Sequence, residues 1–203
     1  MDDLFGFEDD LKPVLMKGAT VSYLRKLKLE KSDTMMRDYF IREIPWRSES
    51  VTIWGKQHLQ PRLIAWYGDD GKSYKYSGTR FHPLPWSPML QWLREVVERK
   101  SNALFNSVLL NYYRDHNDSM GFHSDDEKEL GSQPTIASLS FGEKRTLLFK
   151  NKTQEAMPVV RLTLESGSLL VMRGDTQKNW KHGIAKEQRP VGPRVNLTFR
   201  KII

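Results

Sequence analysis

The chain has 203 residues, 38% of them hydrophobic and 11% aromatic, which is enough to bury the core of one globular domain with a modest extension. It contains no cysteine, which excludes disulfides, thiolate nucleophiles and cysteine-ligated zinc or iron–sulfur sites. The formal net charge of +7, from 32 Lys and Arg against 25 Asp and Glu, favours a polyanionic partner.

The first 43 residues predict an acidic lead-in followed by helices. Residues 1–20 form an acidic lead-in, and residues 20–43 carry apolar side chains, such as Leu24 and Leu27, that suggest one face of a helix. Ser32 is a suitable N-cap for a second helix within this segment, and Pro45 ends the pattern.

From residue 51 onward the sequence predicts short strands separated by turns, interrupted by one helix. That helix begins at Ser87-Pro88, because Ser is a good cap and Pro fits the first helical position, and it runs to Arg99. The predicted strands span residues 51–54, 62–67, 105–113, 136–141, 146–150, 159–164, 168–172 and 194–200. Helices first and many short strands later predict an α+β chain with a β-sandwich or barrel.

Membrane association and secretion are not expected. No apolar run approaches the ~18–20 residues that a membrane span needs. The acidic N-terminus lacks the basic region and apolar stretch of a signal peptide. A cytoplasmic location, or a nuclear one in a eukaryotic cell, is therefore the expectation.

Five histidines are the best candidates for metal ligation in a chain without cysteine. Two His and one carboxylate on one side of an iron ion leave three coordination positions open. A His-x-Asp pair on an extended segment can supply two such ligands, because side chains i and i+2 point the same way. Two pairs are present, His116/Asp118 and His123/Asp125, and the residues alone leave both open, although the first reads as a solvated turn. His182 could complete either set, or be an ordinary half-buried histidine.

Polar and apolar residues alternate strictly along residues 194–200. One face carries Arg194, Asn196, Thr198 and Arg200, and it is either the solvated face of an amphipathic strand or a row of donors in a cavity. Two arginine forks in such a cavity suit a dicarboxylate. Residues 111 and 113 offer an amide and a phenol on one face of another strand, which could orient a small acid.

Taken together, these segments resemble the AlkB family of Fe(II)/2-oxoglutarate-dependent nucleic acid dealkylases. The resemblance covers about residues 40–203 and rests on residues 111–113, 123–127, 136–142, 180–182 and 193–200. It implies an α+β fold with a double-stranded β-helix core (a cupin-like jelly roll), N-terminal helices and a nucleotide-recognition lid. It also implies an N-terminal extension and helical segment over residues 1–40 and a dioxygenase domain over 41–203, with the lid at about 48–80 and the catalytic core at about 103–203.

The resemblance also implies the activity. It is the oxidative demethylation of N-alkylated bases such as 1-methyladenine and 3-methylcytosine in DNA or RNA, with Fe(II), O2 and 2-oxoglutarate, releasing formaldehyde, succinate and CO2. His123, Asp125 and His182 are the implied iron ligands. Arg200 would pair with the distal carboxylate of 2-oxoglutarate, and Arg194 would lie near its metal-chelating end. The implied co-substrate residues are Asn111, Tyr113, Arg194, Asn196, Thr198 and Arg200.

Substrate binding is expected to involve the lid and the acidic residues that follow the first two iron ligands in the sequence. Tyr76 would stack on a base flipped out of the helix, and Trp54 would be either a wedge that fills the resulting gap or a packed lid aromatic. The implied substrate residues are Trp54, Trp66, Tyr74, Tyr76, Ser77, Asp126 and Glu127. Asp126 and Glu127 would favour a cationic methylated ring or, alternatively, form a solvated acidic turn. Candidate phosphate contacts are Arg62, Lys72, Lys75 and Arg80.

Two rival readings stay open. A 2-oxoglutarate hydroxylase acting on protein is disfavoured by the basic charge and by the aromatic residues of the lid. A binding module with a dead site is disfavoured by the complete set of metal and co-substrate residues. The protein is expected to act as a monomer.

Overall fold

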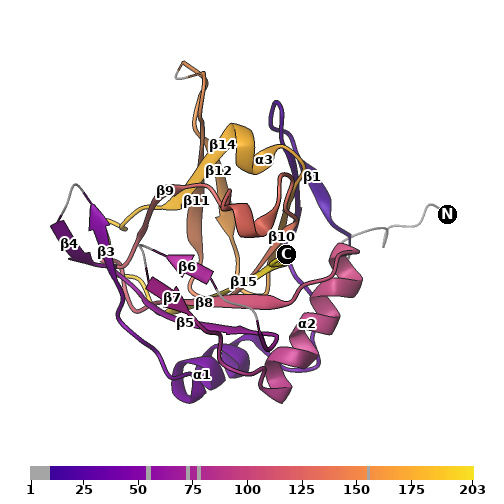
Figure 1. The fold of residues 1–203 in the computed structure, drawn as a ribbon, viewed down its shortest axis with the longest axis vertical. Coiled ribbons are helices and arrows are strands. Elements are labelled where there is room, and N and C mark those ends of the chain that lie inside the picture. The colour runs from indigo at the N-terminus through magenta and orange to yellow at the C-terminus, as the bar shows by residue number, and fades with distance from the viewer. Residues whose placement is uncertain (1–9, 54–55, 72–73, 77–78, 155) are drawn as a thin grey trace.

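Two antiparallel sheets face each other across a buried interior. The computed structural model describes residues 10–53, 56–71, 74–76, 79–154 and 156–203, with the backbone alone described at 51–53, 56, 74–76 and 79–81. Figure 1 shows the smaller sheet in the upper part of the molecule, the larger sheet beneath it, and helices α1 and α2 at the bottom and lower right. Trp54 and Ser77 lie outside the described residues.

The larger sheet contributes seven described strands. Their spatial order is β1 (Lys12–Val14), β2 (Thr20–Leu24), β13 (Leu169–Arg173), β10 (Ile136–Gly142), β15 (Arg194–Arg200), β8 (Ser107–Tyr113) and β5 (Leu63–Gly68). The smaller sheet has the order β12 (Val160–Leu164), β11 (Arg145–Asn151), β14 (Trp180–Ile184) and β9 (Met120–His123). This pair of antiparallel sheets confirms the predicted jelly-roll fold.

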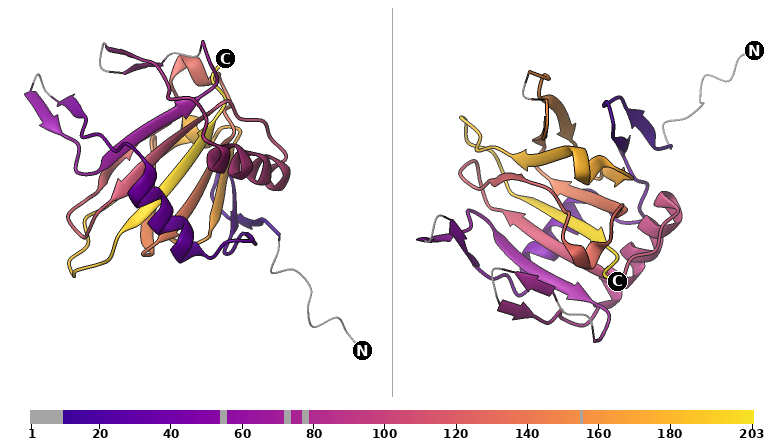
Figure 2. Two further views of the ribbon diagram at one scale, coloured as in Figure 1. Left: turned by 90° about the horizontal axis from the view of Figure 1, so that it is seen from below. Right: turned by 45° about the horizontal axis from the view of Figure 1, so that its top comes forward.

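Two hairpins extend from this core at the side of β5. They are β3 (Ser50–Ile53) with β4 (Lys56–Leu59), and β6 (Tyr74–Tyr76) with β7 (Thr79–Phe81). Both hairpins fall within the segment expected to form a lid. Figure 2 shows them beside the sheets, close to the edge formed by β5.

Helices cover the outer face of the larger sheet. They are α1 (Asp33–Glu43) and α2 (Pro88–Ser101), whose apolar residues join one hydrophobic cluster with that face, while a second cluster fills the space between the sheets. The caps are as predicted, since Ser32 accepts from the Met35 amide, and Ser87 accepts from the Leu90 amide. The remaining helical turns are 3-10 helix η1 (Lys128–Leu130) and α3 (Thr176–Asn179). None of the helices in the described part of the chain is long and apolar enough to cross a membrane.

The prediction of helix from residue 20 was wrong for its first part. Residues 20–24 form strand β2, which pairs with the edge of β13, and only α1 is helical among the described residues before residue 50. The expectation of several N-terminal helices is therefore corrected to one. The backbone of β13 needs a partner on this side, and satisfying it outweighs a weak helical preference.

The N-terminal hairpin formed by β1 and β2 also contacts the segment that leads into β14. The Lys17 carbonyl accepts a hydrogen bond from Trp180 Nε1 (3.0 Å), and the Gly18 carbonyl accepts one from Asn179 Nδ2 (2.7 Å). The Thr20 amide donates to Thr176 Oγ1 (3.0 Å). Residues expected to be a simple lead-in therefore support the strand that carries His182.

Candidate metal centre and adjoining pocket

Strands β9 and β14 bring two histidines together. His123 and His182 are directly paired across the two strands, with ring centroids 4.4 Å apart. The strands approach closely at Gly183, where an added Cβ would lie 2.9 Å from the Met120 carbonyl oxygen. Sequence analysis predicted neither strand, because both are short and contain glycine, which lacks strand propensity.

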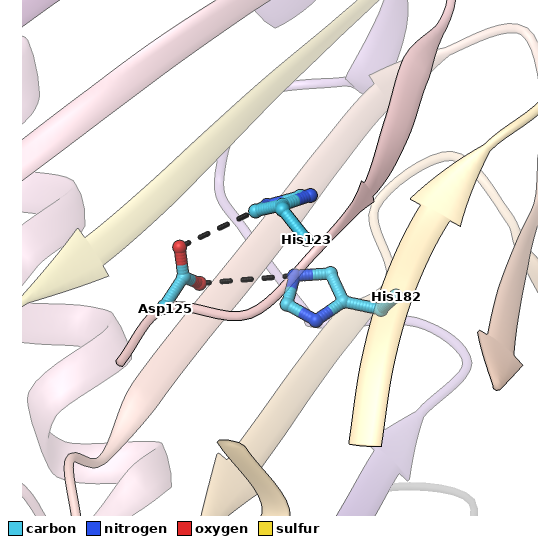
Figure 3. Close-up of side chains that lie close together, drawn as sticks. All are labelled: His123, Asp125 and His182. Carbon is cyan, nitrogen blue, oxygen red and sulfur yellow. Dashed lines mark ion pairs between the residues drawn. The ribbon is translucent and has the colours of Figure 1, made fainter. Parts of the chain in front are cut away.

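Asp125 follows the end of β9 and points at both rings (Figure 3). Its two carboxylate oxygens lie 3.8 Å from His123 Nε2 and 3.7 Å from His182 Nε2. Potential ligand atoms of the three residues all lie within 4.8 Å of one another, and no second such group exists among the described residues. The other His-x-Asp pair lies in a loop, where the Asp118 carboxylate receives Arg114 Nε and Nη2.

Several hydrogen bonds hold this constellation in place. The Asp125 amide donates to Gln177 Oε1 (3.0 Å), and Ser124 Oγ donates to the Trp180 carbonyl (2.9 Å). His123 Nδ1 lies 3.0 Å from the Gly121 carbonyl, an arrangement in which Nδ1 carries the proton and Nε2 presents a lone pair. The loop of Asp125 is thus tied to the segment before His182.

Burial and neighbouring charges set the protonation of the site. Burial lowers the pKa of His182 to about 3, with the nearby His123 acting in the same direction, so its ring is neutral near pH 7. Burial alone would raise the pKa of Asp125, but the Arg200 guanidinium, 2.7 Å away, and the two histidines outweigh it and lower that pKa. A neutral imidazole and an ionised carboxylate are the forms that bind metals.

The three side chains fit an Fe(II) ion. Two imidazole nitrogens and one carboxylate are the ligand set of non-haem iron oxygenases. Ligand atoms at right angles about a metal with bonds of ~2.1 Å are roughly 3 Å apart. The ligand atoms here lie within 4.8 Å of one another, so a contraction of at most about 2 Å would close the site. Asp125 Oδ2 is buried and has no hydrogen-bond partner among the described residues, which leaves it available as a ligand.

A pocket extends from these residues between the two sheets. The polar face predicted on residues 194–200 lines it, and three of its four side chains are buried, so the alternative of a solvated face is wrong. Strand β8 adds Asn111 and Tyr113, which are paired with Asn196 and Arg194. The apolar residues of β15 lie on its other face, in one cluster with residues of α1 and α2.

Arg194 is a buried cation in this pocket. Its Nη2 donates to Ser140 Oγ and Asn196 Oδ1, both at 2.9 Å, whereas Nε and Nη1 have no hydrogen-bond partner among the described residues. Burial lowers the pKa of Arg194 to about 10, while the neighbouring Tyr113 acts in the opposite direction. A positively charged group with free donors fits a carboxylate.

The positions of Arg194 and Arg200 along the pocket are the opposite of those that the family resemblance implied. Arg200 contacts Asp125, so it lies at the metal end of the pocket rather than at its far end. Arg194 stands six residues earlier on the same strand, ~20 Å away at ~3.3 Å per residue. Strict alternation along residues 194–200 predicts both arginines on one face of the strand. It does not show which end of the strand lies beside His123, Asp125 and His182.

Arg62 was expected to contact phosphate, and the structure corrects this. The side chain is buried, and its Nε donates to Asn111 Oδ1 (2.8 Å). Sequence analysis also missed Ser138 and Ser140, whose hydroxyls donate to Asn196 Oδ1. These two serines could have been found, because they alternate with apolar residues along 136–141 as the polar residues of β15 do.

Three of the expected substrate residues have described side chains, and these lie outside the pocket lining given above: Trp66, Asp126 and Glu127. Asp126 is exposed and pairs with Lys152 Nζ (2.8 Å), which also donates to the Gln177 carbonyl. Glu127 is half-buried, and Trp66 is opposite Leu109 in a register that places it on the same sheet face as Asn111. Tyr74 and Tyr76 belong to β6, of which the backbone alone is described.

The sequence matches the family described as the 2OG-Fe(II) oxygenase superfamily over residues 20–200. Similar curated proteins include the mouse alpha-ketoglutarate-dependent dioxygenase alkB homolog 3, 40% identical over 86% of this chain and 63% of that protein. The human DNA oxidative demethylase ALKBH2 is 43% identical over 75% of this chain and 61% of that protein. Its Arabidopsis thaliana counterpart is 34% identical over 92% of this chain and 67% of that protein.

The chain spans less than two thirds of the length of the mouse and human relatives. Among solved structures, that of OsALKBH1 superposes with a TM-score of 0.61, covering 94% of this chain and 99% of that one. The two sequences are 16% identical, so this likeness concerns the fold alone.

Proposed function

Because the chain belongs to the 2OG-Fe(II) oxygenase superfamily, and within it to the AlkB family of dioxygenases, we propose that it oxidatively demethylates N-alkylated bases in nucleic acid. The proposed substrates are 1-methyladenine and 3-methylcytosine in DNA, with RNA as a further substrate, and the products are the repaired base, formaldehyde, succinate and CO2. The observation that carries the proposal is the convergence of His123, Asp125 and His182 beside a pocket that ends in buried Arg194.

In this proposal His123, Asp125 and His182 hold Fe(II). When bound, the metal with 2-oxoglutarate supplies the oxidation of an N-methyl group by O2. His182 contributes a neutral nitrogen because burial keeps its pKa low. Arg200 keeps the Asp125 carboxylate ionised, and Gln177 fixes its backbone beside β14.

The pocket residues orient the co-substrate. Arg194 offers Nε and Nη1 to the distal carboxylate of 2-oxoglutarate, and the apolar side chains between the sheets exclude water from its carbon chain. Asn111 is held by Arg62, and Asn196 by the two serines of β10, so both amides are fixed before a ligand arrives. Tyr113 and Thr198 complete the lining.

The target base is proposed to enter beneath the lid. Extraction of a base from the stack costs a few kcal/mol, and aromatic side chains repay part of it. Tyr76 is the proposed stacking partner, with Tyr74 and Ser77 in support and Trp54 as a wedge. Trp66 and Glu127 would line the entrance. Asp126 would act there together with its partner Lys152, so its charge is partly compensated.

The test is loss of a methyl group from defined oligonucleotides. The protein is incubated with Fe(II), ascorbate, 2-oxoglutarate and single- or double-stranded DNA or RNA carrying one 1-methyladenine, and mass spectrometry follows the product. Methyl loss that needs both 2-oxoglutarate and His123, checked with His123→Ala, supports the proposal. Succinate formation without methyl loss would redirect the search to protein substrates, and no turnover of a folded, metal-loaded protein would favour a binding module.

A further inference from the structure

A second buried arginine lies behind the pocket, in a position that sequence analysis did not single out. Arg145 begins β11, is 1% exposed and does not line the pocket. Its guanidinium carbon lies 5.5 Å from the centre of the Tyr113 ring, and that of Arg194 lies 5.1 Å from the same ring. Two cations therefore share one aromatic side chain that separates Arg145 from the pocket.

The hydrogen bonds of Arg145 join two loops at this end of the sheets. Its Nη2 donates to the Asp118 carbonyl (2.8 Å) and the Ala185 carbonyl (2.6 Å), and Nη1 donates to the Asp115 carbonyl (3.3 Å). These loops lead into β9 and out of β14, the two strands that carry the histidines. Arg145 thereby fixes the wall against which Tyr113 packs.

The charge of Arg145 is only partly compensated. Among the described residues its one carboxylate partner is Glu187, with Oε1 3.3 Å from Nε and a side chain that is 37% exposed. The Asp118 carboxylate faces Arg114 instead, and Arg194 Nη2 donates to the neutral Ser140 and Asn196. Among the described residues, Glu187 at the periphery is thus the one acid paired with either of the two buried cations, Arg145 and Arg194.

An excess of buried positive charge is costly unless a ligand neutralises it. We propose that Arg145 is a positioning residue for the dicarboxylate co-substrate: it holds Tyr113 against Arg194 and adds a second positive charge at the end of the pocket that receives the distal carboxylate. This inference rests on the proposed use of 2-oxoglutarate. It concerns the preference for a dianion, which is separable from metal binding and from turnover.

The test compares two ligands that differ only at the far end. Calorimetry on the Mn(II)-loaded protein measures Kd for 2-oxoglutarate and for 2-oxopentanoate, which has the same chelating end and a methyl group instead of the distal carboxylate. In Arg145→Gln the preference for 2-oxoglutarate should fall by about tenfold, whereas Arg145→Lys, which keeps the charge, should retain it within about threefold. Lys144→Gln is the matched control, because it removes the same charge from the exposed side chain that precedes Arg145, and it should leave the preference unchanged.

Glu187→Gln provides a second variant that does not disturb the core. Without this negative charge, the positive potential of Arg145 in the pocket is less compensated. The preference for 2-oxoglutarate should therefore rise by about twofold. An unchanged preference in both Glu187→Gln and Arg145→Gln, or equal losses for both ligands, would overturn the inference. Failure of the wild-type protein to bind 2-oxoglutarate would instead contradict the proposed function.

Discussion

Arg200 Nη2 lies 2.7 Å from Asp125 Oδ1, so a cation from the larger sheet holds the carboxylate that stands between the two histidines. Both side chains are largely buried. A charge-assisted hydrogen bond of this kind is about twice as strong as one between neutral groups. The contact therefore joins the proposed metal centre to the pocket before metal or co-substrate binds.

Replacement of Arg200 should weaken metal binding and shift its pH dependence. Arg200 lowers the pKa of Asp125, so Arg200→Gln raises it, and binding should begin to fail at a higher pH as the solution is acidified. We expect a loss of about tenfold or more in Mn(II) affinity at neutral pH. Titration of Mn(II) at several pH values measures this. Arg200→Lys should restore part of the affinity, and identical pH profiles for Arg200→Gln and wild type would contradict the prediction.

Gly183→Ala should separate the two histidine strands. The new methyl group would lie 2.9 Å from the Met120 carbonyl oxygen and 3.1 Å from the Gly121 backbone, so β14 must move away from β9. Metal affinity should fall by about tenfold or more, with a loss of ~1–3 kcal/mol in the free energy of unfolding. Gly121→Ala on the facing strand is the control, because its Cβ would have no heavy atom within 4 Å. Equal metal affinity in the two variants would argue against this account.

The metal-free protein should lose stability as the pH falls below about 6.5. Burial depresses the pKa of His182 to about 3 in the folded state, so the unfolded chain binds one more proton between these values. The free energy of unfolding should therefore decrease with falling pH by up to ~1.4 kcal/mol per unit in this window. Urea unfolding at pH 7 and pH 5 in the presence of a chelator measures the slope. His182→Gln should flatten it, and a slope that this variant leaves unaltered would assign the effect to other groups.

Trp54→Ala tests the proposed wedge. If the side chain fills the gap left by a flipped base, the variant should lose about tenfold or more activity on duplex DNA and little on single strands, where no gap must be filled. Rates on the same methylated strand with and without its complement give the comparison. Equal losses on both substrates would instead make Trp54 a packing residue of the lid.

The sequence predicts the fold class and much of the site because these depend on periodic patterns. Alternation over residues 194–200 identified a strand with a polar face, and Ser87-Pro88 identified the start of α2. The metal residues were identified through a family resemblance, since spacing alone left two His-x-Asp pairs open. In the structure His123 is paired with His182, whereas Asp118 is bound by Arg114, and these pairings favour the second His-x-Asp pair.

Contacts between distant segments could not be predicted in this way. Arg62 and Arg145 look like surface charges in sequence, and only the register of the sheets shows that each is buried against its acceptors. The order of Arg194 and Arg200 along the pocket likewise depends on where β9 meets β14. Strand β2 was misassigned because its pairing partner, β13, lies about 150 residues away.

The N-terminal hairpin of β1 and β2 helps to define the smallest part of the chain that can form the site. The family match begins at residue 20, and every proposed ligand lies beyond it. However, the Lys17 and Gly18 carbonyls accept hydrogen bonds from the Trp180 and Asn179 side chains, next to His182. A fragment that begins at residue 20 would keep every proposed ligand but would lose the carbonyl groups that hold the segment before His182 in place. The segment that must fold to form the site is therefore longer than the segment that contains the ligands.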